Sequence, residues 1–235
     1  MRGALRTAGK RDDPLARIGR VVGSVAFLPL TSRFVTFKQL SHLELHSGAS
    51  ALRTECMPRF TPDEIRATFA NSDDFNELFD AFEDAVALRI EDVELYRLLF
   101  WNHSLGPDEL CLFGEKLAKE FPGIAYDIYM WLASVFEVTY SSYDNFELAI
   151  KYYRKAAREK PAALDPYLDA CDCYEPDLNI PPVDVLLEFL KQGLEHVTNK
   201  KAILLRLSHL YHVIGDEELS NYYRDLADEI DRPQN

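Results

Sequence analysis

The sequence predicts an all-α protein built from antiparallel helix hairpins, and three observations support this prediction. After residue 57, apolar residues recur at helical spacing through most of the chain. Capping residues, Pro and Gly divide these apolar segments at short intervals, as they do at the ends of helices. No stretch shows the sustained alternation that is typical of a half-buried strand. With 235 residues, 47% of them hydrophobic, the chain is long enough to bury a core in one domain or one short repeat array.

The clearest helix is expected over residues 144–161 and forms one half of a hairpin. Its apolar stripe comprises Phe146, Ala149, Ile150, Tyr153 and Ala156, while its cations Lys151, Arg154, Lys155 and Arg158 lie largely on the other side. Asp144 followed by Glu147 predicts a capping box, and Pro161 stops the helix. The apolar stripe needs a partner, and the mostly apolar segment 124–140 supplies one across the short turn 141–143.

The other helices are expected on both sides of this pair. Thr61, Pro62 and Glu64 predict a strong helix start, with a capping Thr, Pro at the first helical position and Glu at the third. About ten helices in five hairpins follow from the apolar spacing. In chain order they cover 64–70, 75–90, 92–103, 108–121, 124–140, 144–161, 165–174, 183–197, 200–214 and 217–230. Residues 175–182 are too long and too rich in Pro for an ordinary turn, so an inserted loop is expected there.

The central pair resembles the tetratricopeptide repeat (TPR), whose pattern runs through two helices to a final Pro. The matching positions are Ala133, Phe136, Glu137, Tyr140, Ala149, Tyr153, Ala156 and Pro161. Two of them depart from the pattern: Ala133 replaces a large aromatic residue, and Glu137 replaces a small one. The first-helix spacing recurs at Tyr96, Leu99, Phe100 and His103, at Tyr167, Ala170, Cys171 and Tyr174, and at Leu204, Leu207, Ser208 and Tyr211. The resemblance implies a divergent, right-handed α-solenoid of about five antiparallel helix hairpins, covering roughly three quarters of the chain.

The resemblance also implies a function and the residues that would carry it. Such arrays usually hold a peptide or protein against the first helix of each hairpin, in a concave groove. The groove positions implied here are Ser134, Glu137, Val138, Leu168, Asp172, Leu205, Arg206 and His209. The family's clamp for acidic carboxyl termini uses Lys, Asn and Arg, and only Arg206 fits that role. We therefore expect a non-catalytic interaction module whose partner is basic or apolar rather than acidic.

Charge is spread unevenly along the chain. The first 60 residues carry ten Lys or Arg and four acids, a net charge of +6, whereas the remaining 175 residues carry a net charge of -19. An acidic helical body repels phosphate, so neither nucleic acid nor an anionic membrane surface is expected as a partner. A second interpretation is that the excess of acids serves only to keep the body soluble.

Residues 1–57 show no sustained period, and we expect a disordered or non-native extension there, followed by a TPR-like helical repeat domain over residues 58–235. The apolar run 21–30 resembles a signal-peptide core, although Gly23 and Pro29 interrupt it, and the Arg-rich composition also fits a transit peptide. We favour a third interpretation, a native start at Met57, because Met57 directly precedes the first well-capped helix. An intact-mass measurement that finds residues 1–56 in the endogenous protein would contradict it.

The cysteines and histidines form no organised site. Four cysteines, at positions 56, 111, 171 and 173, are too few for a disulfide framework and favour a reducing compartment, so a cytoplasmic location is expected. Cys171 and Cys173 lie two apart on a helix, and we expect buried or half-buried thiols rather than metal ligands. His103 is expected to pack with a hydrogen bond, and His209 to face a groove or solvent. The pair His42 and His46 lacks the HExxH pattern, so no metal or cofactor is expected.

No motif for phosphate binding or nucleophilic catalysis occurs, and we expect no enzyme activity. Two alternatives remain open. An all-α hydrolase would need a deep pocket that collects acids or histidines with shifted pKa values. A structural subunit would fill its groove with a second copy of itself, and light scattering at several concentrations would detect that association.

Overall fold

The structure is a computed structural model that describes residues 58–139 and 143–230. Within these residues it contains ten α-helices and a single 3-10 helix, η3 (Pro122–Ile124), but no strand. The α-helices are α1 (Pro62–Asn71), α2 (Phe75–Ala87), α3 (Val93–Phe100), α4 (Pro107–Glu120), α5 (Ala125–Thr139), α6 (Tyr143–Glu159), α7 (Asp165–Asp172), α8 (Val183–His196), α9 (Lys200–Val213) and α10 (Glu217–Ile230). The all-α prediction is confirmed for this part of the chain. The predicted extension over residues 1–57, with Cys56, His42 and His46, lies outside the described residues.

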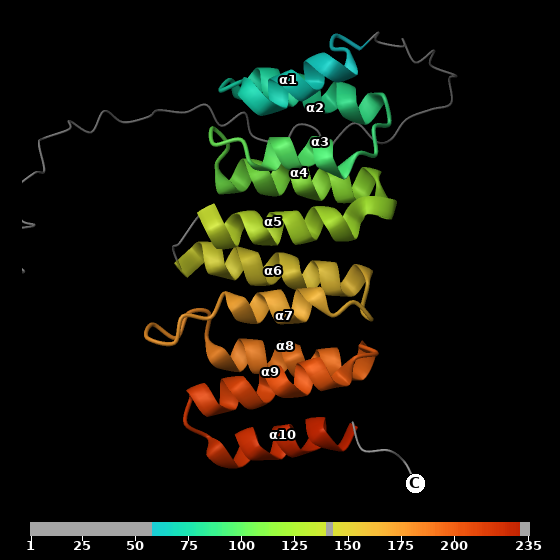
Figure 1. Cartoon of the computed structure of the whole chain (residues 1–235). Helices are drawn as coiled ribbons and strands as arrows, with labels where there is room; N and C mark the ends of the chain where they lie inside the picture. Colours follow the sequence, from blue (N-terminus) through green and yellow to red (C-terminus); the bar gives the residue numbers. More distant parts are fainter. Residues whose placement is uncertain (1–57, 140–142, 231–235) are drawn as a thin grey trace, which may run out of the picture. The chain divides into compact units, whose positions relative to one another are not determined.

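Most helices pack against a neighbour in the chain, and several pack against the next helix but one. Close contacts join α5 to α6 and α9 to α10, and further contacts join α1 to α3, α3 to α5 and α7 to α9. Figure 1 shows the helices following one another in chain order. The expected packing of adjacent helices in pairs is therefore confirmed, and contacts between odd-numbered helices join α1 to α3, α3 to α5 and α7 to α9.

The repeat spacing marks the buried side of the odd-numbered helices. Most residues at the recurring positions are buried. They are Tyr96, Leu99 and Phe100 on α3, Ala133 and Phe136 on α5, Tyr167, Ala170 and Cys171 on α7, and Leu204, Leu207, Ser208 and Tyr211 on α9. On the facing helix α6, Ala149, Tyr153 and Ala156 are buried as well. The predicted apolar stripe of α6 therefore packs as expected.

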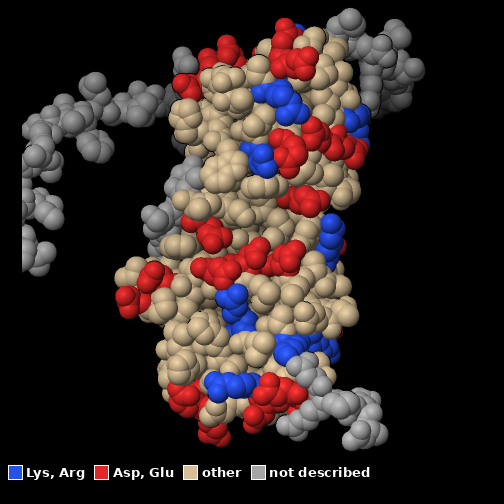
Figure 2. Space-filling view, viewed as in Figure 1, with Lys and Arg blue, Asp and Glu red and all other residues tan. Residues whose placement is uncertain are grey.

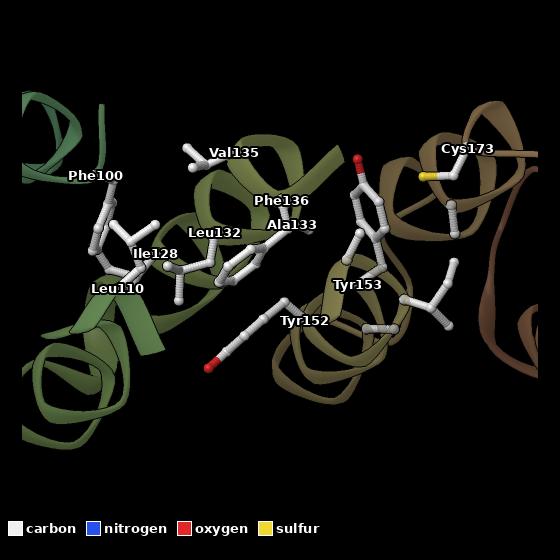
Figure 3. Close-up of a cluster of buried hydrophobic side chains, with 14 of the residues drawn as sticks. Phe100, Leu110, Ile128, Leu132, Ala133, Val135, Phe136, Tyr152, Tyr153 and Cys173 are labelled. Carbon is white, nitrogen blue, oxygen red and sulfur yellow. The ribbon is translucent and has the colours of Figure 1, made fainter. Parts of the chain in front are cut away.

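The sequence prediction missed a second buried face on α6. Tyr152 is fully buried, and its ring stacks on Phe136 of α5 with 5.6 Å between centroids. Figure 3 shows Tyr152 and Tyr153 leaving α6 in different directions, Tyr152 beside Phe136 and Leu132, and Tyr153 on the side that carries Cys173. Two successive residues of α6, Tyr152 and Tyr153, therefore point in different directions, and α6 packs on two sides rather than along one apolar stripe.

The first helix begins as predicted. Thr61 caps α1, and the Glu64 carboxylate accepts a hydrogen bond of 2.8 Å from the Thr61 backbone N–H, which completes a capping box. The capping position predicted at Asp144 is wrong, whereas the helix expected over residues 165–174 begins at the predicted residue. Helix α6 begins at Tyr143, so Asp144 lies within its first turn, and helix α7 already includes Asp165 as its first residue.

Segments between helices also differ in part from the prediction. The inserted loop is confirmed, because residues 173–182 belong to no helix and Glu175 pairs with Ile180 in an isolated bridge. The packing role expected for His103 is wrong: helix α3 ends at Phe100, and the His103 side chain is 88% exposed, with Nε2 3.4 Å from Asp73 Oδ1. At the end of α3, Phe100 is buried, whereas the neighbouring Trp101 is 44% exposed.

Candidate functional site on α5, α7 and α9

The eight residues predicted to line a groove all lie on the three odd-numbered helices α5, α7 and α9. Ser134, Glu137, Leu168 and Arg206 are half-buried, whereas Val138, Asp172, Leu205 and His209 are exposed. The exposure expected for His209 is confirmed. Within this set the structure joins Asp172 to Arg206 by an ion pair, and Ser134 and Glu137 share one partner, Tyr153. The four others, Val138, Leu168, Leu205 and His209, lie on the same helices.

Glu137 is tied to the neighbouring helix. The Tyr153 hydroxyl of α6 donates a hydrogen bond of 2.7 Å to Glu137 Oε2 of α5. Burial makes the largest contribution to the raised pKa of Tyr153, and the Glu137 carboxylate raises it further. The hydroxyl therefore remains protonated and donates its hydrogen bond to Glu137. This bond explains the departure from the repeat pattern at this position. A carboxylate occupies the place of the expected small residue, and the facing hydroxyl compensates for its partial burial.

Helix α7 carries three carboxylates on one face. Asp165, Asp169 and Asp172 are spaced by four and three residues, which places them side by side along the helix. With Glu137 of α5, they form what we call the acidic surface. Figure 2 shows Asp and Glu side chains gathered in a row across the middle helices on the face that it displays.

Asp169 lies at the centre of the acidic surface. Partial burial raises the pKa of Asp169 to about 6, with further increases from Asp165, Asp172 and Glu137. The charge of Arg206 opposes this rise. The sequence prediction named Asp172 and Glu137 but missed Asp165 and Asp169, although the helical spacing back from Asp172 indicates both of them.

Arg206 is the cation that α9 contributes to this region. Its Nη1 lies 2.5 Å from Asp172 Oδ1, and the Arg206 side chain is 28% exposed against 55% for Asp172. One guanidinium opposite four carboxylates leaves the acidic surface with an excess of negative charge. That excess agrees in sign with the net charge of the chain after residue 60.

An aromatic residue lies beside the acidic surface. The pKa of Tyr126 is raised to about 12, mainly by burial and further by the negative charges of Asp165, Asp127 and Asp169. Lys160 Nζ stands 4.1 Å from the centroid of the Tyr126 ring. A ring next to carboxylates offers a face on which a cationic side chain can rest.

The structure offers no arrangement for metal binding by these helices. Among the residues that it describes, no group of three or more His, Cys, Asp or Glu side chains could hold an ion. Cys171 and Cys173 are both buried, as expected, and their thiols donate to the backbone oxygens of Tyr167 and Asp169. Burial raises the pKa of Cys171 to about 12, which disfavours the thiolate that a metal or an electrophile requires.

Two cavities lie between α6 and α8, and neither is lined by a residue of the acidic surface. In ranges 58–139 and 143–230, every helix is too short or too polar to cross a lipid bilayer. Comparison of the sequence with protein-family models and with the curated proteins finds no match.

Proposed function

We propose that the helices form a divergent TPR-like array, a right-handed α-solenoid of five hairpins, that acts as a non-catalytic protein-interaction module in the cytoplasm. Support comes from burial at the recurring repeat positions and from the packing of adjacent helices. In such an array the first helices of successive hairpins line one concave groove. Here these are α5, α7 and α9, which carry both the acidic surface and the positions that the resemblance implies.

The partner that this surface favours is a basic peptide or a basic segment of a protein. The observation that carries this proposal is the grouping of Asp165, Asp169, Asp172 and Glu137 beside the single guanidinium of Arg206. Partial burial first, and then these neighbouring carboxylates, raise the pKa of Asp169. A Lys or Arg side chain of a partner relieves that repulsion, whereas an acidic carboxyl terminus increases it. Tyr126 lies beside Asp165 and Asp169, but Lys160 already stands over its ring, so the carboxylates are the groups proposed to receive the cation.

Proton linkage follows from the same observation. A bound cation stabilises the charged form of Asp169 and lowers its pKa, so binding at a pH near 6 releases protons. Affinity for a basic peptide is therefore expected to fall as the pH decreases through 6, because the free protein then holds a proton that binding must displace.

The test is fluorescence anisotropy on the full chain, with a labelled Arg- and Lys-containing peptide and a labelled acidic peptide of equal length. The basic peptide is expected to bind more tightly, and salt is expected to weaken it. The variant Asp165→Asn/Asp172→Asn should bind it about three- to tenfold less tightly, since exposed pairs contribute up to about 1 kcal/mol each. The matched control Asp225→Asn/Asp228→Asn removes two exposed carboxylates from α10 instead. Preference for the acidic peptide, or an equal loss in the control, would overturn the proposal.

The hydrolase alternative draws on one observation. A carboxyl group with a pKa of about 6 could donate a proton near neutral pH. However, partial burial and three neighbouring carboxylates already account for that pKa, and the two cavities between α6 and α8 do not include Asp169. The alternative of a self-associating subunit is tested by light scattering over a concentration series, in which a constant mass argues against it.

A further inference from the structure

A cleft between α6 and α8 lies apart from the acidic surface and shares none of its residues. The cleft has a volume of about 440 Å³, within the range of small-molecule sites. Helix α6 and the chain after it provide Arg154, Ala157, Arg158 and Pro161, α7 provides Tyr167, and α8 provides Glu188, Phe189, Gln192, Glu195 and His196. The inference drawn from it does not depend on the function proposed above.

The apolar part of the cleft is built from two rings. Tyr167 and Phe189 lie with their centroids 4.7 Å apart. Gly193 of α8 permits this arrangement, because a Cβ there would stand only 2.9 Å from Tyr167 Cδ1. Close packing at Gly193 therefore holds one wall of the cleft in place.

The charged groups of the cleft lie on different helices. Arg154 and Arg158 are four residues apart on α6, and Glu188 and Glu195 are seven apart on α8, so each helix presents one sign of charge. Among the described residues, no ion pair joins either arginine to either glutamate. Opposite charges that border one cleft without pairing leave room for a ligand between them.

The Arg154 side chain has an unsatisfied hydrogen-bond donor. Its Nε is buried and has no hydrogen-bond partner among the residues that the structure describes, and its Nη2 makes a long contact of 3.4 Å to the backbone oxygen of Val185. The guanidinium stands 5.8 Å from the centroid of the Phe189 ring. Buried donors are normally satisfied, so the present position of Arg154 carries an energetic cost that an acceptor could remove.

Arg154 also has space on its other side. A second cavity of about 230 Å³ is lined by Arg154 together with Lys151, Ile150, Val185 and Pro182, among others. The guanidinium thus borders empty volume in two directions and can turn so that Nε and Nη donate together. A planar guanidinium in that position suits the two oxygens of a carboxylate or phosphate group.

We propose that the α6–α8 cleft binds a small dipolar ligand, whose carboxylate or phosphate group faces Arg154 and Arg158 and whose amine faces Glu188 and Glu195. The apolar body of the ligand packs beside Phe189 and Tyr167. Because both signs of charge line the cleft, a ligand of one sign alone leaves the other wall unsatisfied. A zwitterion of amino-acid type is therefore the class that fits this chemistry.

Three probes that share one ring separate the parts of this proposal. Phenylalanine carries both charges, 3-phenylpropionate carries the anion alone, and phenethylamine carries the amine alone. Titration of the full chain, observed by NMR at the Arg Nε–H signals and by calorimetry, is expected to rank phenylalanine first at millimolar concentration. The Arg154 Nε–H signal should shift with phenylalanine and with 3-phenylpropionate, and not with phenethylamine.

Variants then assign the binding to the cleft. Arg154→Gln should weaken phenylalanine binding about tenfold, since a hydrogen bond to a charged group contributes that much. Arg66→Gln, on α1, removes the same charge away from the cleft and should leave binding unchanged. Circular dichroism confirms that each variant remains folded.

Two outcomes would overturn the proposal. One is the absence of phenylalanine binding by the wild-type chain at millimolar concentration. The other is binding that Arg154→Gln leaves intact, with Arg158→Gln as a second variant in case the first unfolds. Equal affinity for phenylalanine and 3-phenylpropionate would refute the role assigned to Glu188 and Glu195.

Discussion

The acidic surface and the α6–α8 cleft differ in how their charged side chains are arranged. On the acidic surface, four carboxylates of α5 and α7 lie close enough to raise the pKa of Asp169, and one guanidinium, that of Arg206, is paired with them. In the cleft, arginines and glutamates stand on separate helices and do not pair with each other in the described part of the chain.

This difference is the basis for the different partners proposed for the two regions. Crowded charges of one sign repel one another, and any cation that approaches lowers that repulsion, so the acidic surface suits an extended basic partner. Separated charges of both signs beside an apolar wall instead favour a ligand of matching size and polarity. The two proposals therefore assign selectivity by charge to the acidic surface, and selectivity by size and polarity to the cleft.

The largest effect is expected from breaking the wall of the cleft. Gly193→Ala places a Cβ against the ring of Tyr167, which cannot move aside as a flexible side chain would. Overpacking costs about 1–3 kcal/mol, partly offset by the better helix propensity of Ala, so the free energy of unfolding should fall by about 1–2 kcal/mol. Urea unfolding followed by circular dichroism measures this change.

Gly123→Ala is the matched control, because the nearest atom to its added Cβ, Glu91 Oε2, lies 3.9 Å away. Its stability should change by less than about 0.5 kcal/mol. Gly193→Ala should also abolish phenylalanine binding while leaving binding of the basic peptide unchanged. If peptide binding fell equally in the folded variant, the two regions would not be independent.

A smaller effect, of opposite sign, is expected at the centre of the acidic surface. The pKa of Asp169 is higher in the folded protein, about 6, than its ordinary value of 3.8, so folding disfavours its charged form. The resulting destabilisation is absent below the unfolded pKa, grows as the pH rises between the two values, and is complete above the folded pKa. Asp169→Asn should therefore stabilise the protein at pH 7, by about 1 kcal/mol once exposure to solvent is allowed for.

Thermal unfolding across the pH range checks this prediction. The gain from Asp169→Asn should disappear between about pH 6 and pH 4. A gain that is constant with pH would mean that the charge of Asp169 is not its source.

Sequence reasoning predicted the helices because their signals are local. Thr61 with Glu64 defines the start of α1, and the spacing of Ala149, Tyr153 and Ala156 identifies a buried side of α6. The burial of Tyr152 was not predicted, because it depends on contact with Phe136 of α5. A pattern with one apolar stripe per helix does not include a second buried face.

The candidate sites were predicted less completely, for a related reason. Glu137 and Asp172 were placed by analogy with a repeat, whereas the crowding around Asp169 depends on how α5, α7 and α9 meet. The cleft was missed entirely. From the sequence, Arg154 is expected to be a solvated cation on the polar side of an amphipathic helix. Its buried Nε and its contact with Phe189 depend on the position of α8, which packs closely at Gly193.

The smallest effect is expected from the ion pair between Asp172 and Arg206. A double-mutant cycle of Asp172→Asn and Arg206→Gln should give a coupling free energy of about 0.2–1 kcal/mol, because both side chains are partly exposed and solvent screens the pair. Arg206→Gln has a second, more informative consequence. Since the charge of Arg206 lowers the pKa of Asp169, its removal should raise that pKa further and tighten binding of the basic peptide above pH 7. NMR titration of the Asp169 carboxyl carbon measures the shift. A fall in peptide affinity would instead mean that Arg206 itself holds the partner, in which case the acidic surface selects for something other than positive charge.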